Sequence, residues 1–256
     1  MKEVFLGTGA NGGTPQIDCK CQNCEAAVEN PSLQRLRSSV LVETSKNKIV
    51  LDCGPDFRLQ LLRGGLRLQD INLIAITHLH FDHSGGLMEL SAGKALNIPV
   101  LVSPENQKIL EQKPDIQFLL KAGFMQFADN ALMEIMGVKL VEVPHDPRFP
   151  TNAVVINDRN MSIWYSPDVT DITESMKKEM KKTDLVIFDA TFMNEDILPA
   201  SKFNHTTIEK SAPEIYRLDV KTIFSHINHS ENPNLVLNFL SKFGFSLAHD
   251  IQIELT

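Results

Sequence analysis

The sequence predicts one layered α/β domain, and three observations support this fold class. Short β-type runs alternate with stretches of helical periodicity along the whole chain. Gly, Pro, Asn or Asp residues end these runs, and no linker, repeat or low-complexity segment divides the chain. With 256 residues, 43% of them hydrophobic, the chain can bury a core without disulfide staples. We therefore expect residues 1–256 to form a single domain.

Short apolar or alternating runs predict the strands, because β-branched and aromatic residues suit a pleated, buried surface. These runs occupy residues 2–6, 39–44, 48–52, 73–77, 99–102, 138–143, 153–157, 161–165, 185–189 and 222–225. Ser45-Lys46-Asn47 and Asp158-Arg159-Asn160 lie between consecutive strand patterns and predict hairpin turns. The sheets should therefore be mixed, with antiparallel portions.

Apolar residues at intervals of three and four predict the helices that cover these sheets. They occupy residues 57–63, 86–96, 104–111, 173–182, 207–218 and 232–243. Because these segments alternate with strands, they should pack on the outside of the sheets.

The charge balance limits the partners of the chain. It has 25 Lys and Arg against 32 Asp and Glu, a net charge of -7. This charge opposes the tracking of a phosphate backbone, so we expect no extended nucleic-acid partner. Met1-Lys2-Glu3 begins the chain without an apolar leader, and no run approaches the roughly 18 apolar residues of a membrane span. We expect a cytoplasmic protein without membrane contact.

Four potential metal ligands occur within six residues, directly after the apolar strand 73–77. They are His78, His80, Asp82 and His83, in the order H-L-H-F-D-H. Imidazole and carboxylate groups suit Zn, Mn or Fe. Because such a short cluster cannot close a whole coordination sphere, the remaining ligands should come from other strand ends.

Three further His and Asp residues follow predicted strands. His145 comes after strand 138–143, Asp168 after strand 161–165 and His226 after strand 222–225. Each is a weak signal alone, since polar residues often close a strand as caps or turn residues. Their shared position at strand ends favours ligands.

The pattern resembles the metallo-β-lactamase superfamily of metal-dependent hydrolases, whose hallmark is H-x-H-x-D-H followed by a His, an Asp and a His. The resemblance covers nearly the whole chain and implies a four-layer αββα sandwich of two mixed β-sheets flanked by helices. It implies two divalent ions (Zn, Mn or Fe), one held by His78, His80 and His145 and the other by Asp82, His83 and His226, with Asp168 bridging them. It also implies that Asp52, which ends strand 48–52, supports the ligand loop.

A second cluster, Cys19, Cys21 and Cys24, has the C-x-C-x-x-C spacing of thiolates that wrap one tetrahedral Zn. Loops this short cannot form a useful disulfide framework, and a cytoplasmic chain keeps its thiols reduced. His229, three residues after His226, is our choice of fourth ligand to this structural zinc. Reduced surface thiols remain the alternative.

Within the superfamily, the early C-x-C-x-x-C and the late H-x-x-H resemble two proteins. One is the cyclic-phosphate phosphodiesterase of the phosphonate-utilisation pathway, and the other is the pyrroloquinoline quinone biosynthesis protein B. The first resemblance implies that His205, in Phe203-Asn204-His205, lies over the metals and contacts phosphate. A His there can protonate a leaving alkoxide or donate to a phosphoryl oxygen, and a helix-start role is the alternative.

The loop Gly7-Thr8-Gly9-Ala10-Asn11-Gly12 fits G-x-G-x-x-G, but it does not predict a nucleotide fold. Its third Gly leads to Gly13-Thr14-Pro15 instead of opening a helix. We expect the loop to bend past the metals and the chain to bind no organic cofactor.

These observations predict a dinuclear hydrolase that acts on a small cyclic or sugar-linked phosphodiester, with His205, Asp82 and Asp168 as catalytic residues. The rival hypothesis is a biosynthetic role like that of the quinone-cofactor protein, with an iron that activates oxygen. A tRNA-trimming nuclease and a non-enzymatic binding module are weaker alternatives. Thioester, lactone and β-lactam hydrolysis fit the same scaffold. We expect a small-molecule substrate and, by base rate, a homodimer.

Overall fold

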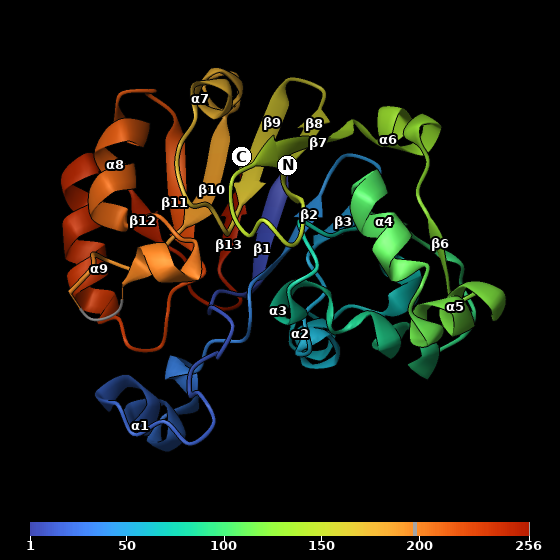
Figure 1. The fold of residues 1–256 in the computed structure, drawn as a ribbon, viewed down its shortest axis with the longest axis horizontal. Coiled ribbons are helices and arrows are strands. Elements are labelled where there is room, and N and C mark those ends of the chain that lie inside the picture. The colour runs from blue at the N-terminus through green and yellow to red at the C-terminus, as the bar shows by residue number, and fades with distance from the viewer. Residues whose placement is uncertain (197–198, 256) are drawn as a thin grey trace.

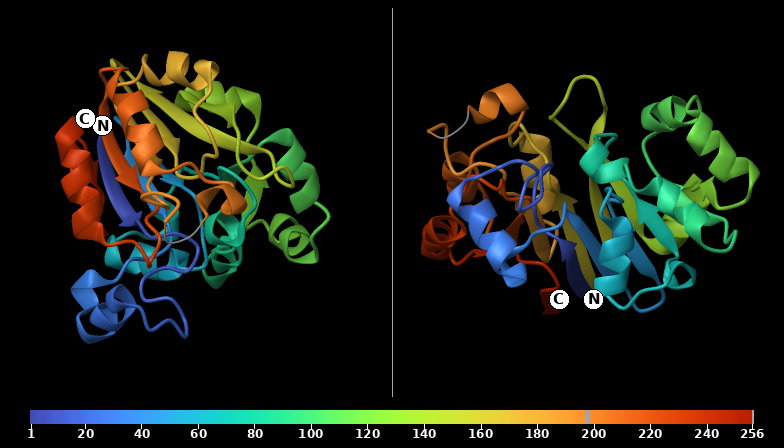
Figure 2. Two further views of the ribbon diagram at one scale, coloured as in Figure 1. Left: turned by 60° about the vertical axis from the view of Figure 1, so that its left-hand side comes forward. Right: turned by 90° about the horizontal axis from the view of Figure 1, so that it is seen from below.

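The computed structural model describes residues 1–196 and 199–255, which form two β-sheets packed face to face with helices on both outer faces (Figure 1). The view from below in Figure 2 separates the layers in the order helices, sheet, sheet, helices. This four-layer αββα arrangement confirms the expected fold class. The two chain ends lie side by side, because β1 (Lys2–Gly7) pairs with β13 (Ile253–Leu255).

The first sheet has the strand order β13-β1-β2-β3-β4-β5-β6. Its other strands are β2 (Ser39–Glu43), β3 (Lys48–Leu51), β4 (Leu73–Ala75), β5 (Ile98–Leu101) and β6 (Met125–Phe127). Neighbours from β13 to β3 are antiparallel, whereas neighbours from β3 to β6 are parallel. Because β3 and β4 run in the same direction, Asp52 and His78 emerge at the same edge of the sheet.

The second sheet has the order β12-β11-β10-β9-β8-β7. Its strands are β7 (Val138–Val143), β8 (Thr151–Asp158), β9 (Met161–Ser166), β10 (Leu185–Asp189), β11 (Lys221–Ser225) and β12 (Ser246–Leu247). β8 is antiparallel to β7 and β9, and the neighbours from β9 to β12 are parallel. The carboxyl ends of β7, β9, β10 and β11 therefore share one edge, where predicted ligands follow β7, β9 and β11.

The α-helices in the described ranges are α1 (Gln22–Glu29), α2 (Phe57–Arg63), α3 (Phe81–Ser84), α4 (Pro104–Leu110), α5 (Pro114–Lys121), α6 (Asn130–Met136), α7 (Glu174–Met180), α8 (Ile208–Tyr216) and α9 (Pro233–Leu240). Short 3₁₀ segments are η1 (Pro31–Leu33), η2 (Leu68–Asp70), η3 (Leu87–Ala92), η4 (Ala200–Phe203) and η5 (Ser241–Phe243). Within the described ranges, no helix has the length and apolar character to cross a membrane.

Alternation along the strands builds three separate core layers. In β10, Leu185 and Ile187 face the layer between the sheets, whereas Val186 and Phe188 face helices α7 to α9. The third layer packs the first sheet against α2 to α5, with Phe57 fully buried in it. Two apolar faces on every central strand explain why these strands read as continuous hydrophobic runs in the sequence.

Every predicted strand and both predicted hairpins are present, while several short elements differ from the expectation. The predicted helix 86–96 is wrong, because this segment forms only the 3₁₀ segment η3 before Gly93. Segment 232–243 likewise ends its α-helix at Leu240 and continues as η5. The peripheral elements α1, α5, α6, β6, β12 and β13 are short and were not predicted. The four-residue helix α3, which carries Asp82 and His83, was not predicted either.

Asp250 gives a prediction for the pH dependence of stability. Its carboxylate accepts from the Leu36 N–H and the Thr8 hydroxyl, both at 2.8 Å. Burial is the main influence, and it raises the pKa of Asp250 to about 6 despite these donors and the nearby Arg35. Because the carboxyl of Asp250 has a higher pKa in the folded than in the unfolded protein, its protonated form stabilises the fold. This stabilisation is fully present below the pKa of the unfolded protein and is lost as the pH rises through the pKa of the folded protein. Between pH 4 and 7, wild type should therefore lose about 2–3 kcal/mol more unfolding free energy than Asp250→Asn.

Urea unfolding of both metal-loaded proteins at several pH values measures this difference. Parallel pH profiles for wild type and Asp250→Asn would contradict the prediction.

Candidate metal centre

The H-L-H-F-D-H motif begins in the loop after β4 and ends within α3, and this loop is held against the end of β3. The Thr77 N–H and hydroxyl donate to Asp52 Oδ1 at 2.8 and 3.0 Å. Gly54 permits the close approach of this loop, since a Cβ at Gly54 would lie 2.0 Å from the Asp82 carbonyl oxygen. Asp52 has a left-handed backbone (φ 61°), which for a non-glycine residue costs about 1–3 kcal/mol and redirects the chain at the strand end.

The first ligand cluster contains His78, His80, His145 and Asp168, whose ligand atoms converge. His78 Nε2 lies 2.8 Å from His80 Nδ1 and 3.2 Å from Asp168 Oδ2. His145 Nε2 lies 3.4 Å from His80 Nδ1 and 3.9 Å from Asp168 Oδ2. Metal–nitrogen bonds of about 2.0–2.1 Å place tetrahedral ligand atoms about 3.4 Å apart. The four atoms therefore fit around one ion.

The second cluster contains Asp82, His83 and His226. Asp82 Oδ2 lies 3.2 Å from His83 Nε2 and 3.3 Å from His226 Nε2. Asp168 Oδ2 lies 2.8 Å from His83 Nε2, so one carboxylate borders both clusters. This is the bridging position that the resemblance implied for Asp168.

Hydrogen bonds to the opposite ring nitrogens fix which nitrogen of each imidazole faces its cluster. The partners are Thr77 Oγ1 for His78 (3.0 Å), Asp146 Oδ2 for His80 (2.8 Å), Asp52 Oδ2 for His83 (2.7 Å), the Asn204 carbonyl oxygen for His145 (2.7 Å) and Thr191 Oγ1 for His226 (2.8 Å). Such outer partners orient metal-binding imidazoles and raise their basicity. Asp52 therefore has the supporting position expected for it, and the Tyr165 hydroxyl also donates to it at 3.0 Å.

Two buried atoms of the clusters, His83 Nε2 and Asp168 Oδ1, have close polar neighbours at 2.8 and 3.2 Å but make no hydrogen bond. Buried polar atoms without partners are costly in a folded protein, and a bound cation would satisfy a carboxylate oxygen and a neutral imidazole nitrogen. The donor set, its spacing and these atoms all fit a pair of divalent ions.

The charges of the clusters depend on one another. Burial favours neutral His83, but the carboxylates of Asp168, Asp82 and Asp52 outweigh it and raise the pKa of His83. Burial and the charge of His83 lower the pKa of His78 well below its ordinary value. Burial favours protonated Asp168, but the imidazoles of His226 and His83 reverse this and hold the pKa of Asp168 well below its usual range. The clusters thus combine anionic carboxylates with imidazoles in a water-poor site.

His205 lies beside the two His/Asp clusters. Its Nδ1 lies 3.9 Å from Asp168 Oδ1, and the ring centroids of His205 and His145 are 5.0 Å apart. Its Nδ1 bonds to Asp189 Oδ2 at 2.7 Å, and its Nε2 has no partner among the described residues. Burial opposes the charged imidazolium, but the Asp189 carboxylate prevails and raises the pKa of His205 to about 8. The ring can therefore carry a proton at neutral pH.

Asp146 and Asp189 belong to the site, although neither was predicted from the sequence. Asp146 directly follows His145 and accepts from both His80 and Arg148. Asp189 closes β10 and accepts from the Val169 N–H, the Thr191 hydroxyl and His205. The same rule that selected Asp168, an acid at a strand end, applies to Asp189 and could have found it. His249, which matched no motif, lies outside the clusters.

The thiols form a separate tetrahedral group. Sγ of Cys19, Cys21 and Cys24 lie 3.5, 3.6 and 3.5 Å from His229 Nδ1. Zn–S bonds of about 2.3 Å and a Zn–N bond of about 2.0–2.1 Å imply S···N distances of about 3.6 Å. The group joins α1 and the segment before it to the loop after β11, where the Asn23 amide also donates to the His229 carbonyl oxygen at 2.9 Å. Its geometry suits one structural zinc.

A cavity of about 710 Å³ opens over the two His/Asp clusters, and its wall includes His205, the Gly-rich loop residues Asn11 and Gly12, and His229. The loop passes the metal centre, as expected, because Ala10 N–H donates to the Ile227 carbonyl oxygen at 3.0 Å. The site is therefore accessible to a small molecule from one side.

Several known proteins are similar to this chain. The family model described as Beta-lactamase superfamily domain matches residues 47–227. An octanoyltransferase of Porphyromonas gingivalis is 40% identical over 91 residues, which are 35% of this chain and 18% of that protein, so the chain spans less than a fifth of it. Coenzyme PQQ synthesis protein B of Methylorubrum extorquens is 25% identical over 301 aligned residues, which cover 98% of both proteins.

Two solved structures share the whole fold. Zn²⁺-bound PqqB from Methylobacterium extorquens has a TM-score of 0.84 at 21% identity, with 100% of both chains covered. A diphosphatase from the PhnP family has a TM-score of 0.79 at 25% identity, with 100% of this chain and 97% of that chain covered. Because the family match spans more than half of the 256 residues, the chain belongs to the metallo-β-lactamase superfamily and falls in the group that includes PqqB and the PhnP-family diphosphatase.

Proposed function

We propose that the protein is a dinuclear metal-dependent hydrolase that cleaves a phosphodiester in a small cyclic or sugar-linked phosphate. The observation that supports this most is the position of Asp168, whose Oδ2 lies 3.2 Å from His78 Nε2 and 2.8 Å from His83 Nε2. One carboxylate between two ligand clusters is an arrangement that could hold two ions close enough for two-metal hydrolysis. The likeness to a PhnP-family diphosphatase supports phosphoryl chemistry. We also propose a cytoplasmic location, where the thiols of the structural zinc group stay reduced.

The chain's own residues supply positioning and proton transfer. Divalent ions held by the clusters would activate water at neutral pH and neutralise charge on the phosphoryl group. His205 lines the cavity and would hold a proton on Nε2, while Asp189 fixes its ring through Nδ1. His205 then donates this proton to the leaving oxygen, a contribution of about 10²–10⁴-fold for a well-placed general acid.

Two substrates with different leaving groups test this proposal. Metal-loaded protein should hydrolyse bis(p-nitrophenyl) phosphate and a nucleoside 2′,3′-cyclic phosphate, and chelation should stop both reactions. His205→Asn should lower kcat for the cyclic phosphate by roughly 10²-fold or more, because its alkoxide needs a proton to leave. The same change should affect the nitrophenyl ester much less, since nitrophenolate leaves unprotonated. His249→Asn, at an exposed position, is the matched control.

A fully metal-loaded protein that cleaves neither ester would refute the phosphodiesterase proposal. Equal loss on both esters in His205→Asn would instead assign His205 to phosphate binding.

A second candidate is a role in cofactor biosynthesis, which the 98% coverage with coenzyme PQQ synthesis protein B favours. In this case a single iron would serve oxygen chemistry. The complete H-x-H-x-D-H ligand set argues for two ions and hydrolysis. Oxygen consumption by an anaerobically iron-loaded preparation, with phosphodiesters left intact, would reverse this order.

A further inference from the structure

Asp52 is the centre of a buried hydrogen-bond network that reaches one imidazole of each His/Asp cluster. His83 Nδ1, in the second cluster, bonds to Asp52 Oδ2 at 2.7 Å. Thr77 Oγ1 donates to Asp52 Oδ1 at 3.0 Å and lies 3.0 Å from Nδ1 of His78, in the first cluster. All four residues are fully buried. The direction of the Asp52 carboxylate therefore affects how both imidazoles are aimed.

Tyr165 reaches Asp52 from the second sheet, whereas Asp52 follows β3 of the first. Tyr165 lies on β9, which pairs with β8 and β10, and it is fully buried in the layer between the sheets. Its hydroxyl donates to Asp52 Oδ2 at 3.0 Å. Burial, the main influence, and the charge of Asp52 raise the pKa of Tyr165 well above its usual value, so the hydroxyl keeps its proton. Asp52 Oδ2 therefore accepts from both His83 and Tyr165.

The strand that carries Tyr165 also delivers the carboxylate that borders both clusters. Asp168 follows β9, three residues after Tyr165, and its Oδ2 lies 2.8 Å from His83 Nε2. The His83 ring thus contacts Asp52 through Nδ1 and Asp168 through Nε2. Because Tyr165 is bonded to Asp52, the segment around the end of β9 acts on both nitrogens of this ring.

Packing alone does not explain the hydroxyl of Tyr165. The residue belongs to the apolar core between the sheets, together with Leu51, Ala75 and Ile187. A phenylalanine has the same ring and would fill this core without placing a polar group in it. A hydroxyl in an apolar layer costs free energy unless it finds a hydrogen-bond partner, and here the partner is Asp52. The hydroxyl therefore serves Asp52 and not the core.

We propose that Tyr165 is a positioning residue that acts through Asp52 on His83 and thereby sets the affinity of the ion held by the second cluster. This inference rests on the two ions of the proposed function, but not on the cleavage of a phosphodiester. With Phe at position 165, Asp52 Oδ2 loses a donor and is held less firmly toward His83. Thr77 still holds Oδ1, so the aim of His78 should persist. Outer partners of this kind contribute about 10- to 100-fold to metal affinity.

Mn²⁺ titration tests this role without any turnover. Protein that retains zinc at its thiols is stripped of the other ions, and free Mn²⁺ is measured by electron paramagnetic resonance. Tyr165→Phe should raise the dissociation constant of the second-cluster ion by about tenfold or more and leave that of the first-cluster ion within about twofold. His226→Ala lacks a ligand of the second cluster and so identifies the first-cluster ion. Adding Tyr165→Phe to His226→Ala should not change the remaining constant.

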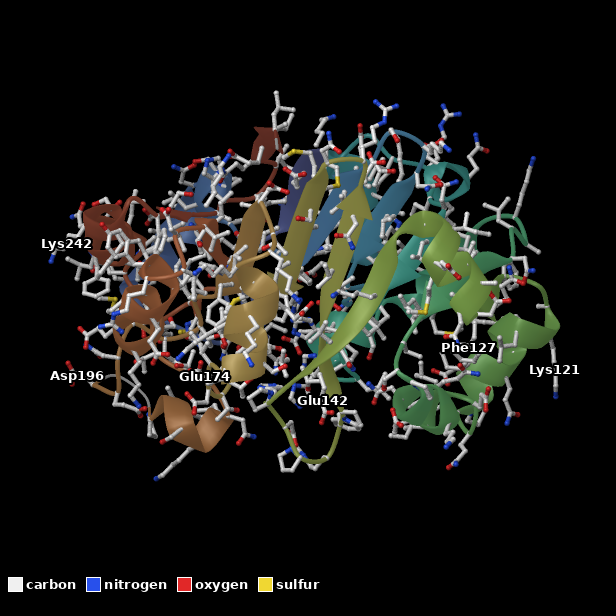
Figure 3. All side chains as sticks on the ribbon, turned by 90° about the horizontal axis from the view of Figure 1, so that it is seen from above. Lys121, Phe127, Glu142, Glu174, Asp196 and Lys242 are labelled. Carbon is white, nitrogen blue, oxygen red and sulfur yellow. The ribbon has the colours of Figure 1, made fainter. Side chains whose placement is uncertain are left out.

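Two further variants separate positioning from packing. Tyr216→Phe removes the hydroxyl of the other tyrosine, which is 58% exposed, and should keep both constants. Tyr216 packs on Phe243, next to Lys242 at the outer edge of the molecule (Figure 3). Asp52→Asn should itself weaken binding of the second ion. Tyr165→Phe should add nothing to this loss, because the hydroxyl acts only through the carboxylate.

The outcomes distinguish this role from the proposed function. Two bound ions with unchanged constants in Tyr165→Phe would overturn the positioning role and leave the proposed function intact. Equal weakening of both ions, or additive losses in the double variant with Asp52→Asn, would show a general loss of packing and overturn the role as well. Selective loss of the second ion in a protein that cleaves no phosphodiester would support the role and contradict the proposed function.

Discussion

Replacing Asp168 with Ala should abolish phosphodiester hydrolysis and remove at least one divalent ion per chain from the metal-loaded protein. Among the residues that the structure describes, Asp168 alone has a carboxylate that borders both clusters, with Oδ2 3.2 Å from His78 Nε2 and 2.8 Å from His83 Nε2. Loss of even one electrostatic group from an active site lowers kcat by about 10²–10³-fold, and loss of a shared ligand should exceed this. We expect kcat/KM to fall by about 10³-fold or more.

Elemental analysis, circular dichroism and a phosphodiester assay measure the effect together. Asp171→Ala removes an exposed carboxylate from the same connection after β9 and should keep both metals and activity. A folded Asp168→Ala protein that retains two ions and normal turnover would show that the clusters are not the catalytic centre.

The second large effect concerns the thiol group. Cys24→Ser should remove one tightly held zinc and lower the melting temperature by roughly 10 °C, because metal-binding free energy in a structural site is folding free energy. Cys24 is fully buried, and its Sγ lies 3.5 Å from His229 Nδ1. Burial, the largest influence, raises the pKa of the Cys24 thiol to about 12 in the metal-free chain, so metal binding must also displace its proton. The shift therefore makes zinc uptake slow or weak at acidic pH.

Cys53→Ser is the matched control, since Cys53 is equally buried but lies outside the thiol group. This variant should keep the full zinc content, although burial of a hydroxyl costs some stability. Unchanged zinc content in Cys24→Ser would disprove the structural site. The separation of the two metal types is also testable, because chelation should remove the hydrolytic ions first and leave the thiol-bound zinc in place.

Central strands were predictable because both of their faces are buried. In β10, the consecutive residues Leu185, Val186, Ile187 and Phe188 are all buried. Such a hydrophobic run predicts a strand without information about the segments that pack against it. The prediction of a helix over residues 86–96 was wrong. The apolar residues of this segment have helical spacing, but only the 3₁₀ segment η3 forms before Gly93. Peripheral elements such as α1 depend on contacts with distant chain, here Asn23 with the carbonyl oxygens of His229 and Glu231, and their local sequence gives little signal.

The sequence by itself determined which atoms are available for metal binding. Imidazoles and carboxylates placed just after apolar strands must meet at a sheet edge, because strands of one direction end there. The candidate ligands His145, Asp168 and His226 could therefore be selected from the sequence, although the first and the last lie 81 positions apart.

Only the tertiary structure decided how those ligands are aimed and what surrounds them. Asp146, Asp189 and Thr191 select the ring nitrogens of His80, His205 and His226 through hydrogen bonds. The cations of the cavity wall come from segments with no common motif, such as the turn holding Arg148 and η4 holding Lys202. These hydrogen bonds and cavity walls depend on how residues that are far apart in the chain lie in space. The hydrophobic periodicity of a sequence does not predict such arrangements.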